Sequence, residues 1–153
     1  EAIACYRKAL ELDPKSAQSH NSLAWLLATG QDHKFRDPDR TVELAAKAVE
    51  LDPKNPLYPN TLGVAHYRVG EWQAAIAVLE KSMALRKGGD ANDWFFLAMA
   101  HWQLGEKDEA RKWYDQAVDW MDKNDPKNEE LGRFRDEAAE LLSIAEQPNP
   151  KEE

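Results

Sequence analysis

One spacing of small and large residues recurs along this chain and restricts it to a repeat fold. In residues 56–89 the spacing predicts two short helices joined by a turn at residues 69–71. The pattern residues fall at positions 7, 8, 11, 15, 20, 24 and 27 of a 34-residue unit, in the order Leu62, Gly63, His66, Gly70, Ala75, Leu79 and Ser82. Because a single helix pair cannot hide its apolar faces from water, such units must stack on one another.

The small residues of the unit indicate how its two helices pack. Gly63 and Ala75 are predicted to stand where the helices cross, since only a residue with little or no side chain lets two backbones approach closely. Residues with helical spacing on each helix are expected to fill the space around that crossing, namely Leu62, His66, Ile76 and Leu79.

A proline fixes where the first helix of this unit can begin. The fourth position of the unit is Pro59, and proline is tolerated only in the first turn of a helix. The helix is therefore predicted to begin at Tyr58 or Pro59.

Two further copies and two partial elements complete the array. Residues 17–53 and 91–124 repeat the pattern in full. Residues 1–14 match only the second helix of a unit, and residues 127–145 carry one apolar stripe, which is typical of a terminal capping helix. The remaining residues, 146–153, contain two prolines and no core residue, so we expect a flexible tail. The array therefore predicts about eight helices.

The half unit at residues 1–14 lacks its first helix, and we expect the chain to be a fragment of a longer protein. Ile3, Tyr6 and Leu10 are then predicted to form an apolar edge that the parent protein or a neighbouring molecule covers. Self-association through this uncovered helix is a possible structural role for the chain.

The first full unit departs from the repeat by an insertion. Residues 30–37 replace the usual short turn and are five residues longer than the repeat needs, and Asp37 with Pro38 restarts the helical pattern. Lys34 and Arg36 flank Phe35, so the loop is either a linker anchored by one apolar side chain or a contact loop for an acidic partner.

The recurring residues resemble the tetratricopeptide repeat (TPR) family over roughly residues 2–125. The resemblance implies an all-α, right-handed solenoid, which we expect to form a single domain over residues 1–145. Two stretches, residues 22–29 and 93–100, are also similar in sequence to TPR segments attached to large bacterial signalling proteins, including serine/threonine kinases. The family resemblance implies a non-catalytic module that binds another protein.

In TPR arrays the first helices line a concave groove, and fixed positions of each unit face it. Carried over position by position, the resemblance implies a partner-binding groove formed by Asn21, Trp25, Asn60, Val64, Tyr67, Arg68, Asn92, Phe95, Met99 and Trp102. Its aromatic side chains would supply binding energy, and its amides would hydrogen-bond a peptide backbone. The alternative is that some of these rings pack against the next repeat and close the groove.

One known use of the fold is excluded by the residue types. TPR domains that clamp the C-terminal carboxylates of heat-shock chaperones use lysine, arginine and asparagine at five positions. The corresponding residues here include no cation, and they are Asn21, Trp25, Thr61, Asn92 and Phe96. Without charge-assisted hydrogen bonds a dicarboxylate clamp has no basis, so a bound peptide should be held mainly by apolar side chains.

Charge and cysteine content narrow the partner classes further. A formal net charge of −8 argues against nucleic acid, because phosphate binding needs a basic surface. The charge is uneven, since residues 105–153 hold 15 acids and 8 bases whereas the preceding residues hold 13 and 12. The single cysteine, Cys5, fits a reducing compartment, so we expect a cytoplasmic location. No apolar run is long enough to span a bilayer.

The sequence carries no arrangement of residues that predicts catalysis or a cofactor. The serines lack a histidine and acid partner at plausible spacing, and no glycine-rich phosphate loop is present. His66 and His101 recur at position 11 of successive units, but the repeat offers no third or fourth metal ligand, so we expect packed or hydrogen-bonded histidines.

Overall fold

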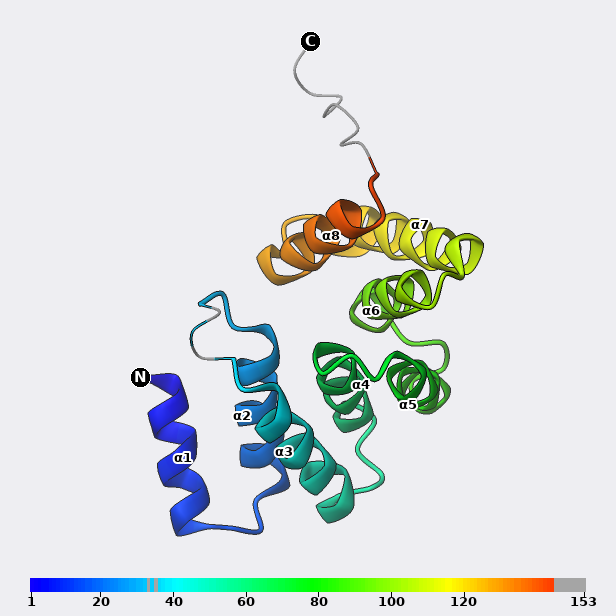
Figure 1. Cartoon of the computed structure of the whole chain (residues 1–153). Helices are drawn as coiled ribbons and strands as arrows, with labels where there is room; N and C mark the ends of the chain where they lie inside the picture. Colours follow the sequence, from blue (N-terminus) through cyan, green and yellow to red (C-terminus); the bar gives the residue numbers. More distant parts are fainter. Residues whose placement is uncertain (33, 35, 145–153) are drawn as a thin grey trace. The chain divides into compact units, whose positions relative to one another are not determined.

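The computed structural model describes residues 1–32, 34 and 36–144, and all regular structure in them is α-helical or a short helical turn (Figure 1). The helices are α1 (Ala2–Leu12), α2 (Ala17–Thr29), α3 (Pro38–Leu51), α4 (Tyr58–Arg68), α5 (Trp72–Leu85), α6 (Ala91–Gln103), α7 (Lys107–Asn124) and α8 (Glu129–Leu141). The prediction of an all-α repeat of about eight helices is confirmed. None of these helices is both long and apolar enough to cross a membrane.

The helices group into two compact units, residues 1–89 and the residues from Asp90 onward. In the first unit each helix packs on the next in the sequence, and α2 also packs on α4. In the second unit α6 packs on both α7 and α8. First helices of successive repeats are thus neighbours within the first unit, as stacking of the repeat requires.

Polar side chains fix where the helices begin. Ser16 accepts a hydrogen bond from the backbone of Ser19, and Asp37 accepts one from Arg40 ahead of α3. At the start of α6 the side chains of Asp90 and Asp93 form a reciprocal capping box. Each such cap satisfies an amide that the first turn leaves without a partner and stabilises its helix by about 1 kcal/mol.

The close crossing predicted for the central unit is present between α4 and α5. A Cβ atom built on Gly63 would lie 2.6 Å from Cγ of Leu79 and 3.4 Å from the carbonyl oxygen of Ala75. Gly63, Ala75 and Leu79 are all buried. A side chain at position 63 would therefore collide with the core.

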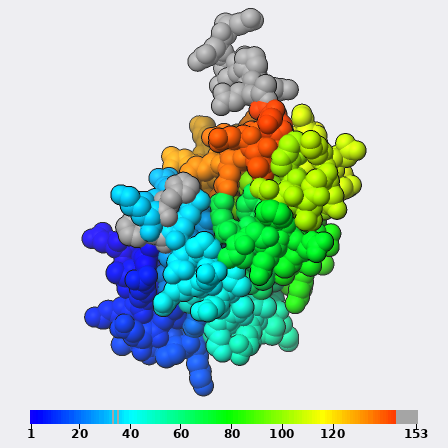
Figure 2. Space-filling model, in the orientation of Figure 1, coloured from blue at the N-terminus to red at the C-terminus, as the bar shows by residue number. Residues whose placement is uncertain are grey.

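The N-terminal helix is not the uncovered apolar edge that the sequence predicts. The side chains of Ile3, Tyr6 and Leu10 pack against a core that contains Leu23 and Leu27 of α2. The expectation that another molecule must cover these three residues is wrong, because neighbouring helices of the same unit already pack on them. On the surface of α1, dark blue in Figure 2, the large apolar side chain is that of Leu12, which is 80% exposed.

The C-terminal helix caps the second unit as predicted but is shorter. Leu131, Phe134 and Ala138 of α8 are buried, and the helix ends at Leu141. The predicted end at residue 145 and the predicted tail at residues 146–153 lie outside the described residues. The boundary of one domain at residues 1–145 stays a prediction.

Candidate functional site

The ten groove residues predicted from the sequence separate into two sets in the structure. Six keep part of their side chain exposed, namely Asn21, Trp25, Tyr67, Arg68, Asn92 and Trp102. Four are buried, namely Asn60, Val64, Phe95 and Met99. The buried four contribute to the interior rather than to a surface that a partner can touch.

Within the first unit, four of the partly exposed residues lie on two packed first helices. We call Asn21 and Trp25 of α2, together with Tyr67 and Arg68 of α4, the α2–α4 surface. Arg68 connects the two helices, because its Nε donates a hydrogen bond of 3.0 Å to the carbonyl oxygen of Ala28. This bond satisfies one of the carbonyls that the last turn of a helix leaves without an intrahelical partner.

The Arg68 guanidinium also stacks on an aromatic ring of its own helix. Its central carbon lies 5.7 Å from the centroid of the Tyr67 ring, within the range of a cation–π interaction. The hydrogen bond and the stacking together hold Arg68 against α2 and orient Tyr67. The α2–α4 surface is therefore ordered without any ligand.

The side-chain oxygen of Asn21 lies beneath the α2–α4 surface. This Oδ1 atom is shielded from solvent and has no hydrogen-bond partner among the described residues. A buried acceptor without a donor costs about 1–3 kcal/mol, and because the atom is shielded, a bound chain does not reach it directly. Figure 1 shows α2 and α4, which carry the surface, within the first unit.

Phe95 and Phe96 of α6 form part of a packed interior and not of a groove. Phe95 is fully buried, with its ring edge-on to that of Tyr114 of α7 at a centroid distance of 6.0 Å. Phe96 packs in the same way on Phe134 of α8 at 5.0 Å. Phe95, predicted to line the groove, is instead part of the packing between α6 and α7.

Two residues of α6 remain partly exposed. Trp102 carries the ammonium group of Lys107 5.0 Å from its ring centroid. Asn92 lies in the first turn, where its backbone N–H donates to Asp90. Both belong to the second unit, whereas the α2–α4 surface belongs to the first.

The two recurring histidines are bound to glutamates within their own turns. Nδ1 of His66 lies 2.5 Å from Oε2 of Glu71, and His101 pairs in the same way with Glu106. In both turns the glutamate N–H also donates to the histidine carbonyl oxygen, at 3.0 and 2.9 Å. The expectation of hydrogen-bonded histidines is confirmed, and the described residues contain no group of three or more metal-ligating side chains.

Tyr58, the first residue of α4, is a buried titratable group. Tyr58 is 7% exposed, and burial raises the pKa of its hydroxyl, with a further contribution from the nearby charge of Asp52 and an opposing one from a hydrogen bond with Asn55. The ionised form is therefore disfavoured in the folded chain.

Sequence reasoning missed a pocket beside the insertion. It has a volume of about 940 Å³ and lies between α1 and the segment that joins α2 to α3. Its lining combines apolar residues, among them Ile3 and Leu26, with charged residues of both signs. The insertion at residues 30–37 was the signal, because an ordinary short turn has no residues with which to build a second wall. The predicted anchoring role of Phe35 lies outside the described residues.

Comparison with known proteins identifies the repeat. The sequence pattern of the family described as "Tetratricopeptide repeat" matches residues 60–129, and that described as "TPR repeat" matches residues 1–29. Together the two matches cover more than half of the chain. The chain belongs to the tetratricopeptide repeat family, and its fold is an all-α TPR solenoid.

Solved structures show the same fold. The crystal structure of MamA aligns with 92% of this chain and 82% of its own, at 25% identity and a TM-score of 0.62. TTC0263 of Thermus thermophilus, a thermophilic TPR protein, aligns with 93% of this chain and 72% of its own, at 17% identity and a TM-score of 0.66.

A third structure is that of the first TPR of Spaghetti (RPAP3), bound to the HSP90 peptide SRMEEVD. It aligns with 78% of this chain and 93% of its own, at 20% identity and a TM-score of 0.54. No curated protein sequence matches the chain.

Proposed function

We propose that this tetratricopeptide repeat chain is a non-catalytic module that binds an extended peptide or a helix of another protein, with the α2–α4 surface as its principal site. The observation that carries the proposal is the pair of partly exposed rings, Trp25 and Tyr67, on two packed first helices. The hydrogen bond from Arg68 to Ala28 keeps these two helices in register. Rigid aromatic side chains are usual components of a binding hot spot.

The chemistry of the site favours an apolar peptide over an acidic terminus. Two positions of the chaperone clamp are filled by Thr61, which is 2% exposed, and by Phe96, which is fully buried. Neither offers a cation to a carboxylate. The structure of Spaghetti with its HSP90 peptide shows that this fold can hold a peptide, but we expect a different peptide class here.

Capture of partners by variants tests the proposal. A Trp25→Ala, Tyr67→Ala double variant should lose the proteins that the unchanged chain retains in a pull-down, because each ring contributes about 2 kcal/mol when fully desolvated. The matched control is Trp113→Ala on α7, a partly exposed ring that lies outside the α2–α4 surface and has the ammonium group of Lys112 over its face. Recovery of the same proteins by the double variant would show that the α2–α4 surface is not the site.

A further inference from the structure

One side of the N-terminal helix is apolar and faces solvent. It is a different side from the one on which Ile3 and Leu10 pack against the core of the first unit. Its residues follow one another at a helical spacing of three or four, which places them on one face. We call this set the open face of α1, and it consists of Ala2, Cys5, Ala9 and Leu12. Ala9 is partly exposed and the other three residues are exposed.

The corresponding face of α3 is part of the core. Both α1 and α3 end at a Leu-Asp-Pro turn, at residues 12–14 and 51–53. Aligned on these turns, the open face of α1 corresponds to Thr41, Leu44, Ala48 and Leu51. The first three of these are buried and the fourth is partly exposed. No residue of α1 is buried, whereas α3 buries four, so the same repeat positions are core in α3 and surface in α1.

The helix that covers this face of α3 is the first helix of its own repeat. α2 packs along α3, and Leu44 belongs to one core cluster with Leu23, Ala24 and Leu27 of α2. These three residues occupy repeat positions 7, 8 and 11. Position 8 is small again in α4, where it is Gly63 and α5 packs closely against it. A small residue beside two large apolar ones is therefore the pattern that fits a second helix in this chain.

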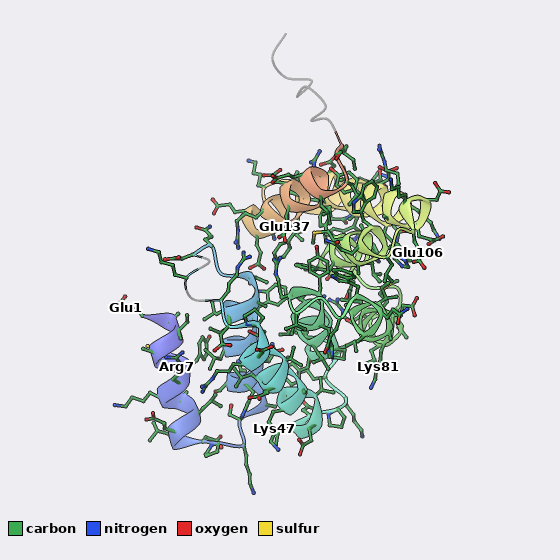
Figure 3. All side chains as sticks on the ribbon, in the orientation of Figure 1. Glu1, Arg7, Lys47, Lys81, Glu106 and Glu137 are labelled. Carbon is green, nitrogen blue, oxygen red and sulfur yellow. The ribbon has the colours of Figure 1, made fainter. Side chains whose placement is uncertain are left out.

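A helix on the open face would continue packing that the first unit already has. α1 packs on α2, as α3 packs on α4, and the first helices α2 and α4 also pack on each other. A first-type helix beside α1 would therefore join the row of first helices next to α2. Arg7 and Lys47 mark α1 and α3 in Figure 3, where α1 stands at the edge of the first unit.

The size of α1 argues against a second copy as the occupant. The helix has eleven residues and is about 16 Å long. One face of such a helix presents far less than the roughly 800 Å² that each partner buries in a stable complex. Two copies joined through α1 alone would therefore not form a stable dimer, whereas a helix that lies beside both α1 and α2 gains contacts from two elements.

We propose that the open face of α1 binds an amphipathic helix of another protein, which completes the half repeat by supplying the first-helix pattern. The helix carries large apolar residues in the places of Leu23 and Leu27 and a small residue in the place of Ala24. Recognition is apolar, because the open face has no charged residue. The proposal does not depend on the α2–α4 surface, with which the open face shares no residue.

Fluorescence anisotropy with labelled peptides tests the proposal on the whole chain. The peptide AQSHNSLAWLLAT, which has the sequence of residues 17–29, should bind in a saturable manner. The same peptide with Ala24→Trp should bind at least about tenfold more weakly, because a large side chain keeps the two backbones apart. Failure of the first peptide to bind, or equal binding of both, would overturn the proposal.

A pair of matched double variants locates the site. Cys5→Glu with Leu12→Glu should weaken binding of the peptide about tenfold or more, because it places two charges in an apolar contact. Ala77→Glu with Ala84→Glu makes the same change in net charge at exposed positions of α5 and should leave affinity within about twofold. Equal losses in both doubles would overturn the assignment to α1. Far-UV circular dichroism of each variant checks that the helices are retained.

The reactivity of Cys5 locates the peptide without any substitution. This residue is the single cysteine of the chain and is exposed. Saturating peptide should slow its alkylation by iodoacetamide about fivefold or more, and an unchanged rate with the peptide bound would overturn the proposal. Light scattering against concentration tests the other occupant. A dimer that Cys5→Glu with Leu12→Glu abolishes would assign the open face to a second copy and would also overturn it.

Discussion

Helices α2 and α6 occupy the same place in their repeats but use it differently. Each has thirteen residues, of which five are buried in α2 and nine in α6. The fifth repeat position is Phe95 in α6, where it is fully buried, and Asn21 in α2, where it is partly exposed. The ninth is Met99 in α6, again fully buried, and Trp25 in α2, again partly exposed. Equivalent repeat positions thus serve as core in one helix and as surface in the other.

The contrast shows what decides whether an aromatic side chain of a repeat is buried or exposed. A side chain at a groove position stays accessible only if no neighbouring helix offers it an apolar surface. Phe95 and Phe96 find such surfaces in Tyr114 and Phe134. Burial of each ring stabilises the fold by several kcal/mol. The same ring left exposed in an empty groove would contribute far less to stability.

The largest expected effect tests the interior role of α6. Phe96→Ala should lower the free energy of unfolding by about 3–5 kcal/mol, because it removes a fully buried ring and leaves a cavity. Trp25→Ala on the partly exposed face of α2 should cost about 1 kcal/mol. Urea denaturation followed by far-UV circular dichroism measures the loss of stability in both variants. Similar losses would contradict the contrast between the buried face of α6 and the partly exposed face of α2.

The next effect concerns two helical glycines, one in each unit. Gly63→Ala should lower stability by about 1–3 kcal/mol, since the new methyl group would meet the buried Leu79 side chain. Gly132→Ala on α8 should raise stability by about 0.5–1 kcal/mol, because its Cβ meets nothing within 4 Å and alanine favours a helix. Thermal unfolding of the two variants should shift in opposite directions. A shift of the same sign in both would refute the close crossing of α4 and α5.

A smaller effect is expected at the two histidine–glutamate turns, which are alike in the two units. Glu71→Gln and Glu106→Gln should each lower stability by about 0.5–1.5 kcal/mol, through loss of a charged acceptor for a partly buried histidine. Glu80→Gln on the exposed side of α5 is the control and should change little. Urea denaturation measures the loss of stability in each variant. Unequal losses would show that the two histidine–glutamate pairs do not contribute equally to stability despite their common geometry.

The smallest effect is a change of stability in alkaline solution. Because burial raises the pKa of Tyr58 above its usual 10.0, the unfolded chain releases this proton at a lower pH than the folded chain. At pH values well below this usual pKa the tyrosine contributes no pH dependence. As pH rises through that value stability should fall, and the fall should end once the pKa of the folded chain is passed. Urea midpoints measured against pH for the unchanged chain and for Tyr58→Phe should diverge only in this range. Parallel curves would contradict the shift.

Much of the fold follows from the sequence because repeat spacing and helix signals agree. Asp37 with Pro38 fixed the start of α3, and Pro59 predicted that α4 begins at Tyr58 or Pro59, which is where it begins. Proline is tolerated only in a first helical turn, so its position leaves little choice. The small residues Gly63 and Ala75 likewise predicted the crossing of α4 and α5.

The candidate site follows from the sequence only in part. Repeat position assigns a residue to a face, but it does not say whether another helix covers that face. That is why Phe95 was predicted to be accessible and is buried, and why Ile3 was predicted to be uncovered and is packed. The insertion marked a departure from the repeat beside α1, but the pocket itself could not be inferred, because its lining joins residues of α1 to residues between α2 and α3 that are distant in the sequence.

Hydroxyl-radical footprinting of the intact chain tests the central contrast most directly, since the oxidation rate of an aromatic side chain follows its exposure to solvent. We expect fast oxidation of Trp25 and Tyr67 and strong protection of Phe95 and Phe96, relative to the intrinsic reactivity of each residue type. Oxidation of Phe95 and Phe96 as readily as Trp25 and Tyr67 would contradict it.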